Sequence, residues 1–236
     1  MSVTTLLKQR VMFRYFLVSF LVLLSNTVYA LGMQPETTVL VLDQEDGEAS
    51  ITVKNTNDTP SLLQTRIVDV DGTKGTIVLA SPSIVKVDSG EEQTVRFFLQ
   101  TSGEIKNQQL KRIRFLGLPA KKESDKGKSS VAIAVSQSIP LIINPNGLKH
   151  EGEPWKSLNY KYENGRVYIS NPSRYVVRMY PEVNIDGTKV SLQNSFISPM
   201  GKVEINFKAP PSVVTIKPVG LYGEVRDEYK IDKSKT

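Results

Sequence analysis

The sequence predicts an all-β protein built from two immunoglobulin-like β-sandwich domains. Apolar and polar residues alternate with a period of two along many short segments, whereas the period of an amphipathic helix is nearly absent. Turn-forming dipeptides of the Asn-Asp, Asp-Gly, Ser-Pro and Ser-Gly kinds separate these segments. The 236 residues include no cysteine, so a hydrophobic core, and not a disulfide framework, must hold the fold together.

Residues 1–30 have the features of a secretory signal peptide. Three basic residues (Lys8, Arg10 and Arg14) precede a ten-residue apolar run, Tyr15 to Leu24, and Val28-Tyr29-Ala30 is a small-x-small cleavage signal. An uncleaved anchor is the weaker alternative, because a spanning helix needs about 20 apolar residues. We therefore expect cleavage after Ala30, export to the periplasm and no stable membrane insertion.

The first domain is predicted over residues 31–148. Its expected strands are Thr37–Asp43, Glu48–Thr56, Leu62–Gly72, Thr76–Ala80, Ile84–Gly90, Glu92–Gln100, Leu110–Pro119 and Val131–Ile143. Strands repeated at roughly 8 to 12 residues are typical of an antiparallel sandwich. A polar segment, Ala120 to Ser130, precedes the last strand.

The second domain is predicted over residues 149–236, after a turn-rich linker, Asn144–Pro154. Its expected strands are Trp155–Gly165, Arg166–Asn171, Tyr175–Gly187, Phe196–Pro199, Lys202–Ala209, Thr215–Gly220 and Glu224–Ile231. Asn164-Gly165 and Asp186-Gly187 are hairpin-type dipeptides, because both residues of each pair accept a positive φ.

The chain offers few groups for catalysis or for nucleic-acid binding. Removing the signal peptide takes away three of 30 Lys and Arg residues and none of 24 acidic ones, so the net charge falls from +6 to +3. The single histidine, His150, lies in the linker, and Asp69 and Asp71 are best interpreted as a solvated turn. Phosphate-loop, H-x-x-H and G-x-S-x-G motifs are absent. We expect no enzyme, no catalytic residue, no metal, no cofactor and no nucleic-acid partner.

The last strand of the first domain has an unusual side-chain pattern. Val131, Ile133 and Val135 project to one face, while Ala132 and Ala134 project to the other. Two interpretations stay open. The strand is either an ordinary inner strand with alanines at a tight contact, or a surface that meets a bulky partner.

The order of several motifs resembles one family. The motifs are Glu48–Asp58, Ser81–Phe98, Leu110–Ala120 with its closing Leu-Pro, Val131–Pro145, Trp155 followed by Arg166–Val177, Phe196–Ile205 and Val219–Val225. Together they resemble the PapD-like periplasmic chaperones of bacterial pilus assembly over nearly the whole mature chain. Each motif alone is weakly specific; their order behind a signal peptide carries the resemblance.

The resemblance implies two immunoglobulin-like domains in a boomerang arrangement and a non-enzymatic, periplasmic function. The chaperone would lend the last strand of its first domain to an incomplete pilus subunit and deliver that subunit to an outer-membrane usher. The donated side chains would be Val131, Ile133 and Val135, with Ile139 at the end of the donated segment. The implied partners are thus pilus or fimbrial subunits and the usher.

The resemblance fails at one functional position. The family grips the subunit's C-terminal carboxylate with two basic residues, but Pro140 and Val39 align with them here. Either another arginine replaces them, with Arg112 or Arg66 as candidates in a divergent branch of the family, or strand pairing alone retains the subunit. We favour the first explanation. Pro140 also removes one N–H from the ladder, which would end the donated segment near Ile139.

One alternative function belongs to a different class. Tandem immunoglobulin-like domains also build exported surface adhesins and receptors. Such a protein normally carries a lipobox cysteine, a sorting tail or its own assembly strand, and the sequence shows none of these. A hydrolase is a weaker alternative still, because the chain has one histidine.

Overall fold

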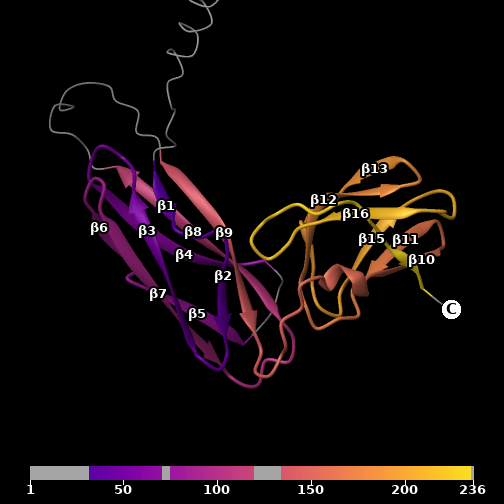
Figure 1. Cartoon of the computed structure of the whole chain (residues 1–236), viewed down its shortest axis with the longest axis horizontal. Helices are drawn as coiled ribbons and strands as arrows, with labels where there is room; N and C mark the ends of the chain where they lie inside the picture. The colour runs from indigo at the N-terminus through magenta and orange to yellow at the C-terminus, as the bar shows by residue number, and fades with distance from the viewer. Residues whose placement is uncertain (1–31, 71–74, 120–133, 235–236) are drawn as a thin grey trace, which may run out of the picture. The chain divides into compact units, whose positions relative to one another are not determined.

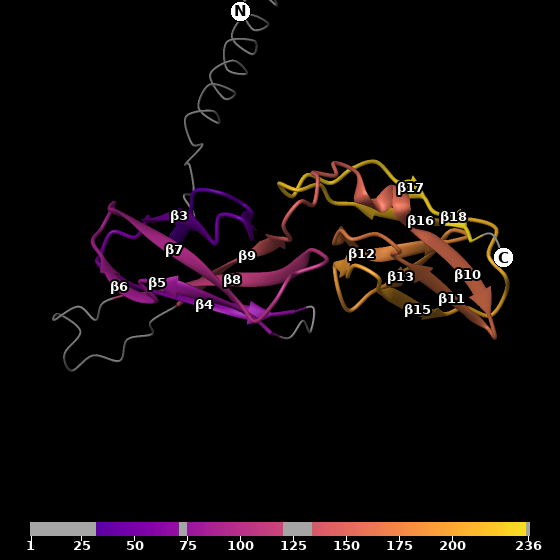
Figure 2. The same ribbon diagram turned by 90° about the horizontal axis from the view of Figure 1, so that it is seen from below.

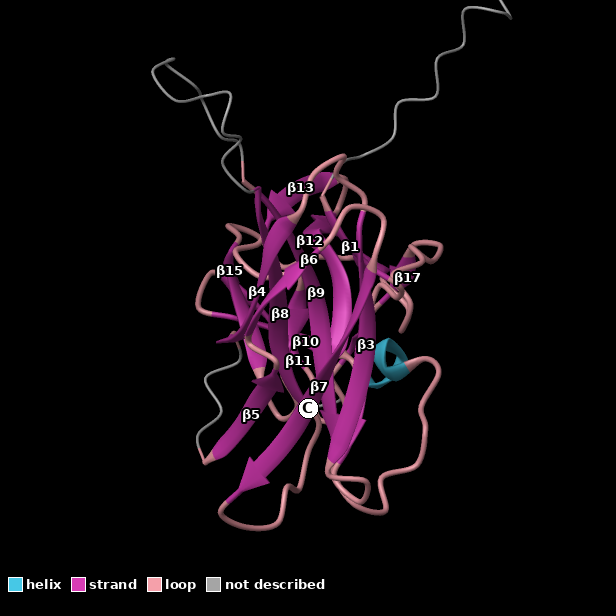
Figure 3. Ribbon diagram, turned by 90° about the vertical axis from the view of Figure 1, so that its left-hand side faces the viewer, coloured by secondary structure: helices cyan, strands magenta, loops and turns pink. Residues whose placement is uncertain are grey.

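The computed structural model describes residues 32–70, 75–119 and 134–234. The predicted signal peptide, Asp71, the polar segment Ala120–Ser130, and the two predicted donor residues Val131 and Ile133 lie outside this range. Within it, strands form nearly all the regular structure, and the one helix is a short 3₁₀ turn (Figure 3). The predicted all-β fold is confirmed.

The first sandwich contains nine strands in two sheets. They are β1 (Met33–Pro35), β2 (Leu40–Asp43), β3 (Glu48–Asn55), β4 (Ser61–Asp69), β5 (Thr76–Ser81), β6 (Ile84–Val87), β7 (Glu92–Thr101), β8 (Gln109–Pro119) and β9 (Val135–Asn144). One sheet has the order β1-β3-β7-β5, and the other has the order β2-β9-β8-β4-β6 (Figure 1). Neighbouring strands run antiparallel except β2 and β9, which are parallel.

The first segment of the chain contributes to both sheets. β1 pairs with β3 in one sheet, and four residues later β2 begins and pairs with β9 in the other. β2 is only four residues long, so it covers only the C-terminal end of the ten-residue β9. This difference in length leaves part of β9 without a neighbour on one side.

The inward faces of the two sheets form the first core. Ile51, Val53 and Phe97 come from one sheet, and Leu63, Phe115 and Leu141 come from the other; each is 0% exposed. Ile51 and Val53 are spaced two apart in β3, because alternate side chains of a strand point to opposite faces. The side chains between them therefore point outward from the sandwich.

The second sandwich follows the 3₁₀ helix η2 (Pro154–Ser157). Its strands are β10 (Asn159–Glu163), β11 (Arg166–Ser170), β12 (Val177–Ile185), β13 (Thr188–Ser191), β14 (Phe196–Ile197), β15 (Lys202–Asn206), β16 (Val214–Pro218), β17 (Tyr229–Lys230) and β18 (Asp232–Lys233) (Figure 2). The sheets have the orders β15-β11-β10-β18 and β13-β12-β16-β17, and β14 pairs with β12. The predicted boundary between residues 148 and 149 falls between β9 and η2.

Two of the predicted strands of the second domain are wrong in part. The strand expected from Trp155 begins only at Asn159, because Pro154 opens the 3₁₀ turn that buries the Trp155 ring. The strand expected over Glu224–Ile231 is reduced to Tyr229–Lys230, since residues 220–224 form a turn closed by the Gly220 N–H to Glu224 O bond at 2.9 Å.

Each sandwich contains a buried asparagine whose side-chain amide donates hydrogen bonds to backbone carbonyls of nearby turns. The Asn55 amide donates to the backbone carbonyls of Thr59 and Val87, both at 3.0 Å. The Asn171 amide donates to the carbonyls of Tyr175 (2.8 Å) and Ile197 (3.2 Å). Both asparagines are 0% exposed and follow the end of a core strand, where they tie turn carbonyls that would otherwise be unpaired.

Candidate functional site

The N-terminal half of β9 has a strand on one side only. On the β8 side, pairing extends from Val135, opposite Gly117, to Ile143, opposite Gln109. On the other side, β2 pairs only with residues Leu141 to Asn144. Among the described residues, no strand pairs with the edge of β9 from Val135 to Pro140 on this side, and Gly32 lies beside the Val135 side chain. We call this segment the open edge.

Side-chain exposure changes sharply along the open edge. Val135 is 41% exposed, and the three polar residues after it are exposed as well. Ile139 is only 7% exposed and belongs to the core of the first sandwich. The apolar side chain available to a partner at this edge is thus Val135, whereas Ile139 is committed to the protein's own fold.

Arg112 lies directly beside the open edge. Its Nε donates to the Ser138 hydroxyl and its Nη2 to the Ser138 carbonyl, both at 2.9 Å. The side chain projects from the outward face of β8, because its neighbours Lys111 and Ile113 point inward and are buried. Partial burial, followed by the positive charge of Arg114, lowers the pKa of Arg112. The guanidinium stays charged, and this environment favours an anionic partner.

A second arginine, Arg178 of β12, was missed by the sequence analysis. Its Nη1 donates to the carbonyls of Leu221 (2.8 Å) and Gly220 (3.3 Å). Burial lowers its pKa, and so does the charge of Arg112, while Glu224 acts in the opposite direction. Arg112 and Arg178 are thus close enough to repel each other although they come from different sandwiches. The sequence feature that could have identified Arg178 is its position in the middle of the apolar segment YVVRMY.

A pocket of about 340 Å³ adjoins Arg178. Both sandwiches contribute to its lining, with Val41 and Ile142 from the first and Trp155 and Leu221 from the second. A small apolar cluster lies at this junction and joins Val39, Leu110 and Ile142 to Val176. The pocket therefore combines apolar side chains with two arginines, Arg178 and Arg226, and two acidic residues, Glu151 and Glu224.

The structure places the two family anchor positions in this same region, without a charge on either. Val39 is 4% exposed within the apolar cluster at the junction. Pro140 is buried and lies opposite Arg112 in the β8–β9 ladder, where β9 continues through it to Asn144. Neither side chain can bind an anion.

Arg66, the other candidate anchor, lies farther from the open edge. It is an exposed residue of β4, directly opposite Arg114 of β8, so β8 separates it from β9. Arg112, Arg114 and Arg66 share the outward face of one sheet. The structure thus places Arg112 at the open edge and Arg66 two strands away.

The candidate catalytic groups are accounted for by structural roles. His150 is exposed at the rim of the Arg178 pocket. Asp69 forms an ion pair with Lys111, whose side chain is 1% exposed. Among the described residues, no cluster of three His, Asp or Glu side chains has a metal-binding arrangement. A search of the same residues finds no helix with the length and apolarity needed to cross a bilayer.

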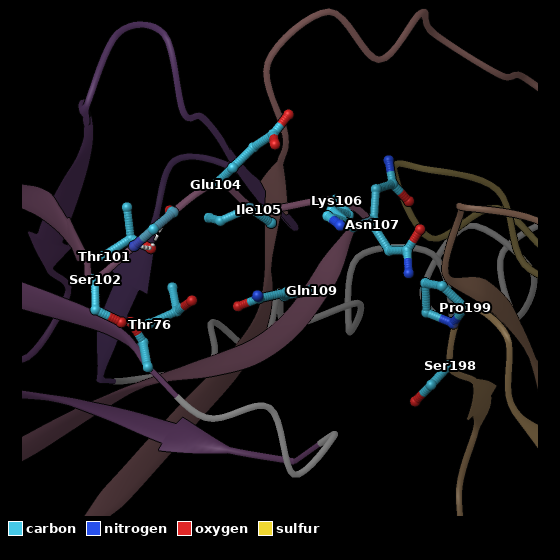
Figure 4. Close-up of a pocket in the computed structure, with 13 residues that line it drawn as sticks. Thr76, Thr101, Ser102, Glu104, Ile105, Lys106, Asn107, Gln109, Ser198 and Pro199 are labelled. Carbon is cyan, nitrogen blue, oxygen red and sulfur yellow. Dashed lines mark hydrogen bonds between the residues drawn. The ribbon is translucent and has the colours of Figure 1, made fainter.

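A second pocket, of about 430 Å³, is lined mainly by uncharged polar residues. Figure 4 shows Thr76, Thr101 and Ser102 on one side, and Ser198 and Pro199 on the other. The Gln109 Oε1 is buried there without a hydrogen-bond partner. Glu104 and Lys106 are the only charged residues of the lining. The pocket lacks the apolar walls typical of small-molecule sites.

Two immunoglobulin-like sandwiches with an open strand edge beside a pair of arginines define a class of protein that binds other proteins by adding a strand to a sheet. Residues 32–149 match the family described as the pili and flagellar-assembly chaperone, PapD N-terminal domain. The chain belongs to this family and is a pilus-assembly chaperone of the PapD type.

Curated relatives and solved structures agree with this assignment. The chain is 40% identical over 169 residues to the uncharacterized fimbrial chaperone YhcA of Escherichia coli K12, covering 71% of this chain and 74% of the relative. It is 26% identical to the chaperone protein FocC of Escherichia coli over 91% and 94% of the two chains.

The fold is that of solved chaperones. The structure of the Salmonella enterica SafA pilin in complex with the SafB chaperone aligns with a TM-score of 0.70 at 13% identity, covering 87% of this chain and 98% of that chain. The Escherichia coli chaperone DraB aligns with a TM-score of 0.69 at 19% identity, over 86% and 98% of the chains.

Proposed function

We propose that this chaperone holds a pilus subunit at the open edge of β9 and completes the subunit's sandwich with its own strand. The observation that carries the proposal is the unequal pairing of β9, which has two neighbours from Leu141 onward and one neighbour before that point. An incomplete sandwich exposes its core and two ladder edges and is prone to aggregate. Strand addition at the open edge covers both of these surfaces.

The donated side chains in this proposal are Val131, Ile133 and Val135. Val135 is exposed at the start of β9, and Val131 and Ile133 precede it at the same period-two spacing. Burying three such side chains contributes about 5 to 9 kcal/mol before the costs of ordering the partners. Ile139 marks the inner end of the segment, because its side chain already packs in the first core.

We further propose that Arg112 and Arg178 replace the missing anchor and bind the C-terminal carboxylate of the subunit. Each guanidinium can form two parallel hydrogen bonds to a carboxylate. A carboxylate between them would relieve their mutual repulsion and place the subunit's last residue beside Ser138. Arg66 is the less favoured of the two predicted anchors, because β8 lies between it and β9.

The remaining steps of the proposed function follow from the resemblance and the family. The mature chaperone would act in the periplasm after cleavage behind Ala30 and would deliver its subunit to an outer-membrane usher. It would act by binding and not by catalysis, as the resemblance to the chaperone family implies. The free energy for subunit folding would then come from strand donation, through backbone pairing and burial of the donated side chains, and not from nucleotide hydrolysis.

Co-expression with single pilus subunits of the source organism tests the proposal. We expect a stable one-to-one complex with the wild-type chaperone and its loss with Val135→Asp, because a carboxylate would enter an apolar groove. Ile77→Asp is the matched control, since Ile77 is 56% exposed in a strand of the same sandwich and lies in the other sheet. Subunits that survive equally well without the chaperone, or a complex that tolerates Val135→Asp, would contradict strand donation.

A further inference from the structure

Arg66 and Arg114 form a cross-strand pair of like charge. They lie directly opposite each other in the antiparallel ladder between β4 and β8. Residues in such a position have Cβ atoms about 4.5 to 5.5 Å apart, and like charges there destabilise a sheet. Both side chains point outward, because the neighbouring Thr65, Ile113 and Phe115 are buried. Two residues of like charge therefore face each other on the surface of the sheet.

No acidic side chain of the described residues lies next to this pair. The direct and diagonal neighbours on the outward face of β4, β8 and β9 are Gln64, Val68, Arg112, Leu116, Ser136, Ser138 and Pro140. None of the ion pairs formed among the described residues includes Arg66, Arg112 or Arg114. Three guanidiniums thus share one face on which the described residues supply no counter-charge.

Elsewhere in the molecule, facing charges are opposite in sign. Lys54 lies opposite Glu92 in the β3–β7 ladder, with Nζ and Oε1 3.6 Å apart. In the second sandwich, Arg166 lies opposite Glu163 in the β10–β11 ladder and also forms an ion pair with Glu204, a diagonal neighbour on β15. The arrangement of Arg66 and Arg114 therefore departs from the pattern that stabilises the other sheets, which points to a partner outside the chain.

The arginines form a continuous path to the open edge. Ser138 of the open edge lies opposite Arg114, and Arg114 lies opposite Arg66, so the three residues form one row across β9, β8 and β4. Arg112 is bonded to the same Ser138. A protein bound at the open edge would therefore lie close to this row of residues, which is on the outward face of the same sheet.

We propose that Arg66 and Arg114 form a second binding element, which receives an acidic segment of the bound pilus subunit. This inference rests on the proposed function, because the subunit must first occupy the open edge. Guanidinium groups suit carboxylates, which they bind with two parallel hydrogen bonds. Two carboxylates on one segment would neutralise the pair, accelerate encounter, and favour acidic subunits over basic ones.

Association kinetics test the proposal. A subunit that copurifies with the wild-type chaperone is diluted from denaturant into chaperone, and the rate of complex formation is followed at low and high salt. For Arg66→Gln/Arg114→Gln we expect an association rate about 3- to 10-fold lower at low salt, little difference in that rate at high salt, and a dissociation rate that rises by a smaller factor, because the hydrogen bonds to the carboxylates are lost. The unfolding midpoint of the free variant should stay the same or rise, because the repulsion is removed.

Arg96→Gln is the matched control, because Arg96 is an exposed strand residue on the other sheet of the same sandwich. An association rate for the double variant equal to that of Arg96→Gln at both salt concentrations would overturn the inference and leave strand donation intact. Wild-type chaperone that forms no complex with any subunit would overturn both. Salt-sensitive binding to phosphatidylglycerol vesicles through the same two arginines, with unchanged subunit association, would assign the row to a membrane surface and overturn the subunit assignment.

Discussion

Leu40 lies opposite Leu141, and this pair marks the point at which the edge of β9 changes from open to closed. Leu40 is the first residue of β2, and Leu141 follows Pro140 in β9. Before this point the backbone of β9 faces a single neighbour, and after it the strand lies inside the sheet. The proposed strand donation depends on this difference in pairing between the two halves of β9. Amide hydrogen exchange measures the difference, because unpaired backbone amides exchange faster than paired ones.

We expect amides from Val135 to Ser138 that point away from β8 to exchange much faster than those of Leu141 to Ile143. Their hydrogen-bonding groups face solvent, whereas those of the closed segment are paired with β2. Binding of a subunit should slow the fast group. Hydrogen–deuterium exchange followed by NMR checks this, and equal protection of both segments in the free protein would argue against an open edge.

We expect Arg112→Gln and Arg178→Gln each to weaken subunit binding by about 10- to 100-fold, which corresponds to the loss of charge-assisted hydrogen bonds. The variants should fold normally, because each substitution removes a repulsion between two arginines. Titration calorimetry with a subunit-derived C-terminal peptide measures the effect. Arg166→Gln serves as the control, since Arg166 pairs with Glu204 on the surface of the second sandwich.

A peptide with an amidated C-terminus extends the same test. If the two arginines bind the terminal carboxylate, amidation should weaken binding to the wild-type chaperone and have little further effect on Arg112→Gln/Arg178→Gln. Equal binding of the acid and the amide would show that the arginines contact another part of the subunit.

We expect Asp69→Asn to destabilise the free chaperone by about 1 to 3 kcal/mol. The substitution leaves the Lys111 ammonium without its carboxylate, while its side chain stays 1% exposed. The loss of stability is limited because the Asp69 side chain is 65% exposed, so water already weakens the ion pair. Adding Lys111→Met should recover most of the stability in urea denaturation, since the buried charge is then absent. A double variant as unstable as Asp69→Asn would contradict this account.

We expect Asn171→Ala to lower the free energy of unfolding by about 2 to 4 kcal/mol. Its amide serves the carbonyls of Tyr175, Ile197 and Ser198, and alanine leaves these buried acceptors unpaired. The exposed Asn206→Ala is the control. Chemical denaturation measures both, and similar effects of the two substitutions would show that the buried amide has no special role.

The alternation of apolar residues was sufficient to predict the class of fold. It identified most strands of both sandwiches, because a strand with one buried face imposes a period of two on its sequence. It failed at Trp155, where a proline starts a helical turn, and over Glu224–Glu228, where the predicted strand is reduced to a single bridge between Val219 and Val225. At these positions local backbone geometry outweighs the apolar pattern.

The site was less predictable than the fold. Arg112 was predicted as one of two candidate anchors, but Arg178 was not, because it comes from the other sandwich and no local spacing relates the two residues. The open edge likewise depends on how far β2 extends along β9, which is a property of pairing between residues about 100 apart in sequence. Such relations follow from the assembled sheet and not from any short segment.

The length of β2 also has a consequence for geometry during assembly. Because β2 occupies the sheet from Leu141 onward, an incoming chain that pairs with β9 has to end its ladder at Pro140. The chaperone's own strand β2 thus sets how far any subunit can advance along β9, whatever the sequence of the subunit. Different subunits would all present their last residue at the same depth, so one chaperone can place many cargoes in a common orientation.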